Sequence, residues 1–136
     1  MQKFQHDLGS LVLRLVGGGM MLYAHGLDKL LNFKAKADYF PDPLKIGATP
    51  SLSLAVFGEV FCALAVALGF KTRYAVIPPM AVMAVAAFVV HAGDPFRKKE
   101  MALLYLAIYV GVWCMGSGTY SLDHLLKKLK QGKKAG

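Results

Sequence analysis

The chain has 136 residues, and this length favours a single domain, which we expect to span residues 1–136. Apolar residue types make up 56% of the sequence, above the roughly 45–50% of an average soluble domain. The formal net charge of +8 would suit a nucleic-acid partner, but we exclude that class because the basic residues lie between long apolar runs and in the C-terminal tail, where anionic lipids attract them.

Four apolar runs predict membrane-spanning helices at residues 8–31, 51–70, 74–91 and 101–117. About 20 helical residues are needed to cross the hydrocarbon core. The first two runs reach that length, the third is adequate, and the fourth is short unless its ends lie at the membrane interface. We therefore predict an all-α fold, an integral membrane four-helix bundle in contact with the lipid bilayer.

The segments between the runs are polar. Residues 32–50 form a loop, residues 69–73 a tight turn, and an amphipathic basic tail at 122–134 is expected to lie on the lipid headgroups. The two cysteines, Cys62 and Cys114, lie inside apolar runs without a C-x-x-C motif. We interpret them as small buried hydrophobic residues, and we expect no metal site.

Orientation follows from the basic residues outside the runs. Four spans place both termini on one side, with Lys3, Lys71, Arg73 and five tail lysines. The opposite side carries seven basic residues: Lys29, Lys34, Lys36, Lys45, Arg97, Lys98 and Lys99. This small excess favours cytoplasmic termini.

Ionisable residues inside the apolar runs are the candidates for function, because each costs about 2.5–3.5 kcal/mol at a helix centre and must find a partner. Arg14, Gly18, His25 and Lys29 fall on nearly one face of the first helix at about 100° per residue. The small face at Gly18 allows a neighbouring helix to approach or leaves room for a flat ligand. Glu59 lies deep in the second helix, at a level that predicts a pair with Arg14 or His25.

The third and fourth helices add two more candidates near the membrane face that carries His25. His91 ends the third run, and Glu100 begins the fourth. Tyr105, Tyr109 and Trp113 form a stripe that we interpret as packing or an interfacial belt. For all the ionisable candidates, a purely structural role in helix packing or capping stays open.

These residues resemble the motifs of the DoxX family of small four-helix membrane proteins, over almost the whole chain. The matching pieces are Arg14-Leu15-x-x-Gly18, His25-Gly26-x-x-Lys29-Leu30, Gly58-Glu59, Leu68-Gly69-x-x-Thr72-Arg73, His91, Glu100-x-Ala102-Leu103-Leu104-Tyr105 and Gly116-Ser117-Gly118-x-Tyr120-Ser121-Leu122-Asp123. Members often have Gly-Pro-Gly where this chain has Gly116-Ser117-Gly118.

The resemblance implies a multi-pass protein of a bacterial or archaeal cytoplasmic (inner) membrane. Some members look like subunits of quinone-linked oxidoreductases, including a thiosulfate:quinone system. Others are linked to oxidative-stress or thiol-redox complexes, and distant relatives act as chaperones or cargo receptors.

Our first hypothesis is a redox subunit that binds a quinone between the helices. His25 or His91 would donate a proton to the ligand, Glu59 would relay protons, and Arg14 or Lys29 would stabilise the anion. A soluble redox partner would supply the electrons, because the sequence has no haem, iron–sulfur or dinucleotide motif. The chain would then be part of an enzyme rather than a whole one.

Two alternatives belong to other classes. One is a non-catalytic membrane scaffold, chaperone or anchor whose buried charges only fix helix packing. The other is a small transporter that uses Glu59, which would need a homo-oligomer to form a pathway.

Overall fold

The computed structural model describes residues 1–135, and this range is helical with no strand, which confirms the predicted all-α fold there. Here η denotes a π-helical segment, in which backbone hydrogen bonds run from residue i to i+5. The first long helix is built from α1 (Gln2–Arg14), η1 (Leu15–Met20), η2 (Leu22–Gly26) and α2 (Leu27–Leu31), and a short α3 (Phe33–Lys36) follows.

The remaining elements follow in the same manner. The second long helix comprises α4 (Ala48–Val56), η3 (Phe57–Cys62) and α5 (Ala63–Leu68). The third comprises α6 (Thr72–Ala75), α7 (Ile77–Val85) and η4 (Ala86–Val90). The chain then forms α8 (Phe96–Met115) and α9 (Leu122–Ala135).

Three continuous helices in the described range are long and apolar enough to cross a membrane. They are Gln2–Leu31 with 30 residues, Ala48–Leu68 with 21 and Thr72–Val90 with 19. They correspond to the first three predicted runs and start two to six residues earlier. Helix α8 has 20 residues, but charged residues fill its first turn, so the fourth predicted span stays a prediction.

Glycine and proline mark the helix ends. Gly69 closes α5 at φ 72°, and Gly116 closes α8 at φ 73°, both in the left-handed region that favours glycine. Pro78 and Pro79 fall in the first turn of α7, where their missing N–H groups are tolerated.

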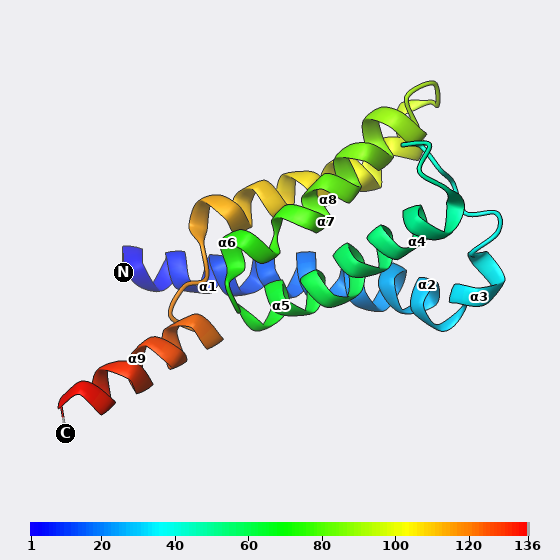
Figure 1. Ribbon diagram of the computed structural model, residues 1–136. Helices are drawn as coiled ribbons and strands as arrows, with labels where there is room; N and C mark the ends of the chain where they lie inside the picture. Colours follow the sequence, from blue (N-terminus) through cyan, green and yellow to red (C-terminus); the bar gives the residue numbers. More distant parts are fainter. Residues whose placement is uncertain (136) are drawn as a thin grey trace.

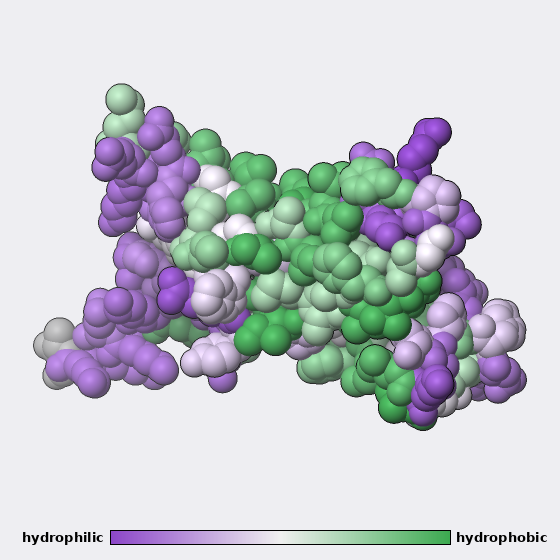
Figure 2. All heavy atoms as spheres, turned by 90° about the horizontal axis from the view of Figure 1, so that it is seen from above, coloured by the Kyte–Doolittle hydropathy of each residue, from purple (hydrophilic) through white to green (hydrophobic). Residues whose placement is uncertain are grey.

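Figure 1 shows α8 running alongside α7, with α1, α4 and α5 below them in this view. The N-terminus and α9 lie at one end of the molecule, and α3 with the loop before α4 lies at the other. Figure 2 shows an apolar band across the middle of the visible face and hydrophilic residues at both ends. This distribution fits helices that cross a lipid bilayer.

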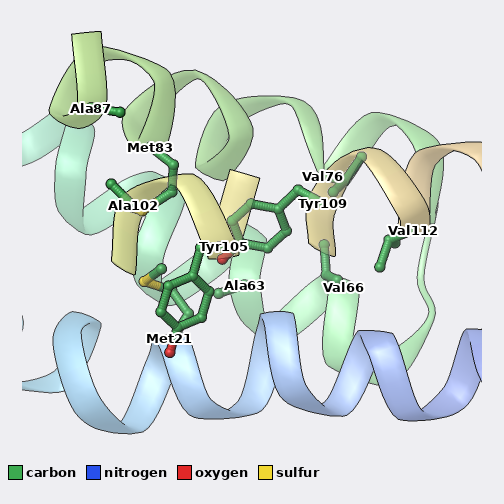
Figure 3. Packing of buried hydrophobic residues seen from close by; sticks show 10 residues of the cluster. All are labelled: Met21, Ala63, Val66, Val76, Met83, Ala87, Ala102, Tyr105, Tyr109 and Val112. Carbon is green, nitrogen blue, oxygen red and sulfur yellow. The ribbon is translucent and has the colours of Figure 1, made fainter. Parts of the chain in front are cut away.

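The main core lies where α8 meets the first, second and third long helices. Figure 3 shows Tyr105 and Tyr109 of α8 directed toward Met21 and Ala63. The Tyr109 hydroxyl is buried and donates a 2.8 Å hydrogen bond to the Gly17 carbonyl. Trp113, the third residue of the aromatic stripe, is half exposed and lies outside this core.

The first and second long helices touch backbone to backbone at two glycines. A Cβ atom at Gly18 would lie 2.4 Å from the Ala63 carbonyl oxygen, and one at Gly26 would lie 2.3 Å from the Glu59 carbonyl oxygen. The second long helix therefore approaches Gly18 closely, as the sequence predicted. Of the cysteines, Cys62 is buried as expected, whereas the prediction for Cys114 was wrong because its side chain faces outward from α8.

Candidate functional site

A cavity of about 720 Å³ lies toward the end of the molecule that holds the loop before α4. Its walls come from η2, α2, α4, η3, α7, η4 and α8, and most of its lining side chains are apolar. Four predicted site residues line it together: His25, Lys29, Glu59 and His91. The volume and the small number of polar groups are typical of a small-molecule site.

The deepest polar group of the cavity is the Glu59 carboxylate, and it pairs with Lys29. The Lys29 ammonium donates a 2.6 Å hydrogen bond to Glu59 Oε2, and the two side chains are 19% and 4% exposed. The sequence analysis predicted that Glu59 pairs with Arg14 or His25, and this prediction was wrong. Lys29 lies one turn beyond His25, and its long side chain reaches back to the carboxylate of the neighbouring helix.

His25 lies in η2 and presents its imidazole to an aromatic ring of α8. The His25 and Tyr105 ring centroids are 5.8 Å apart with perpendicular planes, and the Tyr105 and Tyr109 rings stack at 6.2 Å. Tyr105 also lines the cavity, so its phenol belongs to the candidate site. The sequence interpretation assigned this side chain to packing or an interfacial belt, although its place at the end of the Glu100-x-Ala102-Leu103-Leu104-Tyr105 motif was a usable signal.

His91 is fixed at the mouth of the cavity by an acid that the sequence analysis had passed over. His91 Nδ1 lies 2.7 Å from Asp94 Oδ2, and Lys98 Nζ lies 3.8 Å from Asp94 Oδ1. The hydrogen bond to His91, supported by Lys98, lowers the pKa of the Asp94 carboxyl below its ordinary value. A partner on Nδ1 fixes the orientation of the His91 ring, and His91 lines the cavity.

The loop before α4 covers one side of the cavity with Phe40, Pro41, Pro43 and Leu44. Asp42 holds this loop in place. Its carboxylate accepts hydrogen bonds from Ser51 Oγ at 2.8 Å, Ile46 N at 3.0 Å and Gly47 N at 2.8 Å. These bonds, the one from Ser51 foremost, lower the pKa of Asp42. The sequence analysis predicted a loop at residues 32–50 but not its position over a cavity, because the segment carries no hydrophobic period.

Arg14, a predicted ligand-binding residue, does not line this cavity. Its side chain is 1% exposed and donates to the Ala67 carbonyl at 3.0 Å and to the Tyr120 carbonyl at 2.5 Å. Arg14 is 15 positions before Lys29, which is roughly 22 Å along a helix, so it cannot share the Glu59 site. It joins α1 to the end of α5 and to the segment after α8.

Gly18 and Glu100 also lie apart from the cavity. The space beside Gly18 is filled by the backbone of Ala63 and Ala67, so the alternative of a flat ligand there was wrong. Glu100 is exposed on α8 and is not among the lining residues. Within residues 1–135, no group of three His, Cys, Asp or Glu side chains is placed to hold a metal ion.

The comparisons with known proteins give one match. The family model described as DoxX matches residues 9–92, which cover the first long helix from its eighth residue on and all of the second and third, and end before α8. No significant match was found among curated proteins or among solved structures.

Proposed function

The chain therefore belongs to the DoxX family, and on this premise we propose that it is a membrane subunit of a redox system that binds a quinone-like ligand in the cavity. One observation carries the proposal. An apolar cavity of about 720 Å³ contains a buried Lys29–Glu59 pair and two histidines, each held by a neighbouring side chain.

The shape and chemistry of the lining fit a flat apolar ring with polar carbonyl groups at its edges. Apolar side chains of α4, α7 and α8 would contact the ring face and exclude water. Lys29 Nζ is a hydrogen-bond donor for one carbonyl oxygen, and His25 or His91 is a donor for the other. When bound, a quinone would supply an acceptor for electrons and protons.

The protein's own part is to hold and move protons. Lys29 donates one hydrogen bond of 2.6 Å to the Glu59 carboxylate, and Glu59 would accept and release protons for a ligand in the cavity. Asp94 fixes the ring of His91, and Tyr105 fixes that of His25. Because the sequence lacks haem, iron–sulfur and dinucleotide motifs, a partner protein would deliver the electrons.

The same proposal places the chain in the membrane. Helix α8 would be the fourth span of a four-helix bundle, with its basic first turn at the headgroups. Both termini would then be cytoplasmic, and α9, with five lysines, would lie on the lipid surface. The membrane would be the cytoplasmic membrane of a bacterium or an archaeon.

A binding measurement tests the proposal. The protein is purified in mild detergent, endogenous lipid is removed, and binding of a short-chain quinone is measured by equilibrium titration. Glu59→Gln and His25→Ala should each weaken binding about tenfold or more, because Glu59→Gln removes the carboxylate that holds Lys29 Nζ at the cavity and His25→Ala removes a hydrogen-bond donor to the ligand. The matched controls are Glu100→Gln and His6→Ala, which change an exposed glutamate and an exposed histidine outside the cavity.

Equal affinity in the cavity variants and the control variants would refute quinone binding at this site. The non-catalytic scaffold is the better description if the wild type binds no quinone and co-purifies with a partner protein whose binding requires α9. Circular dichroism of each variant separates a lost contact from a lost fold.

A further inference from the structure

A second cavity, of about 810 Å³, opens at the opposite end of the molecule. It lies between the turn that joins α5 to α6 and the residues that follow α8. Lys71, Thr72, Arg73 and Tyr74 form one wall, and the Gly116–Gly118 segment and Asp123 form the other. This cavity shares no lining residue with the candidate quinone site, and it contains none of the site residues predicted from the sequence.

A buried hydroxyl in its lining lacks a partner. Thr72 is 1% exposed, and its Oγ1 finds no hydrogen-bond partner among residues 1–135. A buried polar atom without a partner is unfavourable, and such atoms are rare in folded proteins. An oxygen-bearing ligand in the cavity would satisfy this group.

The cavity also has an excess of positive charge. Lys71 and Arg73 are exposed cations, and a Cβ atom at Gly116 would lie 3.5 Å from Arg73 Nε, which places the guanidinium along the cavity wall. The one acid of the lining, Asp123, already accepts hydrogen bonds from Lys71 N at 2.8 Å and Thr72 N at 3.3 Å. The two cations outnumber this acid in the lining, and the excess of positive charge favours an anion.

The position along the helices indicates the source of that anion. Thr72 is the first residue of the third candidate span, and Met115, which also lines the cavity, is the last residue of α8. Tyr74, 77% exposed beside them, is a residue type that concentrates at membrane–water interfaces. The cavity thus lies at the level of the lipid headgroups.

We propose that this cavity binds the phosphate group of an anionic lipid. Arg73 and Lys71 would contact the phosphate oxygens, and Thr72 Oγ1 would donate to one of them. The rest of the headgroup would occupy the open part of the cavity beside Ser117 and Gly118. This site is independent of the proposed quinone function.

Native mass spectrometry of the full chain in detergent tests the proposal, with phosphatidylglycerol as the probe and phosphatidylcholine as the zwitterionic comparison. The wild type should bind one phosphatidylglycerol molecule more tightly than all later ones. Arg73→Gln combined with Lys71→Gln should weaken that first binding event about tenfold. Lys127→Gln with Lys128→Gln removes the same charge from α9 and should leave it unchanged.

Thr72→Val keeps the side-chain shape and removes only the hydroxyl, so it tests the site even if the double variant fails to fold. It should weaken phosphatidylglycerol binding, because the lipid phosphate loses one hydrogen-bond donor. Competition by millimolar inorganic phosphate would identify free phosphate rather than lipid as the occupant. Equal binding of the two lipids, or equal losses in the cavity and α9 variants, would overturn the proposal.

Discussion

Lys29 donates to Glu59 across 2.6 Å and thereby links the first membrane helix to the second inside the protein. The link forms beside the point where Gly26 packs on the Glu59 carbonyl, so a charge pair and a backbone contact occur at one depth. Both the stability of the helix pair and the polarity of the cavity depend on this arrangement.

Removal of one partner should be far more harmful than removal of both. Lys29→Met leaves the Glu59 carboxylate buried and unpaired, which should destabilise the protein by about 3 kcal/mol. The double variant with Glu59→Gln should regain most of that loss, because no unpaired charge remains. Thermal unfolding of both variants in the same detergent measures the difference, and a double variant no more stable than Lys29→Met would contradict the pairing.

Two adjacent glycines should respond in opposite ways to the same change. Gly18→Ala forces a methyl group into the backbone of Ala63 and Ala67 and should destabilise the protein by about 2 kcal/mol or more. At Gly19 no described atom lies within 4 Å of an added Cβ, so Gly19→Ala should be neutral or stabilise the helix by up to about 1 kcal/mol. Melting temperatures that fall equally would show that the helices do not touch at Gly18.

Arg14 should control how firmly the segment after α8 is held. Arg14→Met removes the hydrogen bonds to the Ala67 and Tyr120 carbonyls, so both carbonyls lose their partner. We expect faster amide hydrogen exchange in residues 116–123 and no change in quinone affinity, because Arg14 lies away from that cavity. Lys3→Met, an exposed cation on the same helix, is the matched control. Weakened quinone binding in Arg14→Met would support the prediction that Arg14 is a ligand-binding residue.

The loop that covers the cavity should loosen in acid. Since the pKa of Asp42 in the folded protein is below its ordinary value of 3.8, its hydrogen bonds add stability above about pH 4 and lose it as pH falls through the lowered value. Ser51→Ala removes the largest cause of that shift, so loosening should begin at a higher pH than in the wild type. Hydrogen exchange of residues 41–47 between pH 3 and pH 6 provides the measurement. The control is Ser53→Ala, which changes an exposed serine two residues after Ser51 in α4.

The sequence identified the long helices because apolar runs of sufficient length have few alternatives to spanning a membrane. It also identified Glu59 and His25 as inward-facing residues, since charge avoids lipid. It did not identify the partner of Glu59. The prediction matched residues by their level along regular helices of about 100° per residue, whereas the first two long helices contain π-helical segments and the pairing depends on the reach of the Lys29 side chain.

Contacts between distant parts of the chain were the other gap. Asp42 and Ser51 bond within a polar loop, and Asp94 bonds to His91 across a turn. No period or motif marks such pairs, because they depend on the path of the loop rather than on a helix face. Tyr105 was recognised as part of a stripe, but a stripe does not tell which ring borders a cavity.

The π-helical segments explain how ordinary apolar runs present these groups to the interior. His25 lies in η2, Glu59 lies in η3, and His91 directly follows η4. A wide turn accommodates one extra residue, so the side chains before and after it are rotated by about 100° relative to an unbroken α-helix. A one-residue deletion in η3 would leave the helix long enough to span the bilayer yet turn Glu59 or its packing neighbours toward lipid. The position of these polar groups in the interior thus depends on the number of residues in η2, η3 and η4, as well as on the identity of the residues.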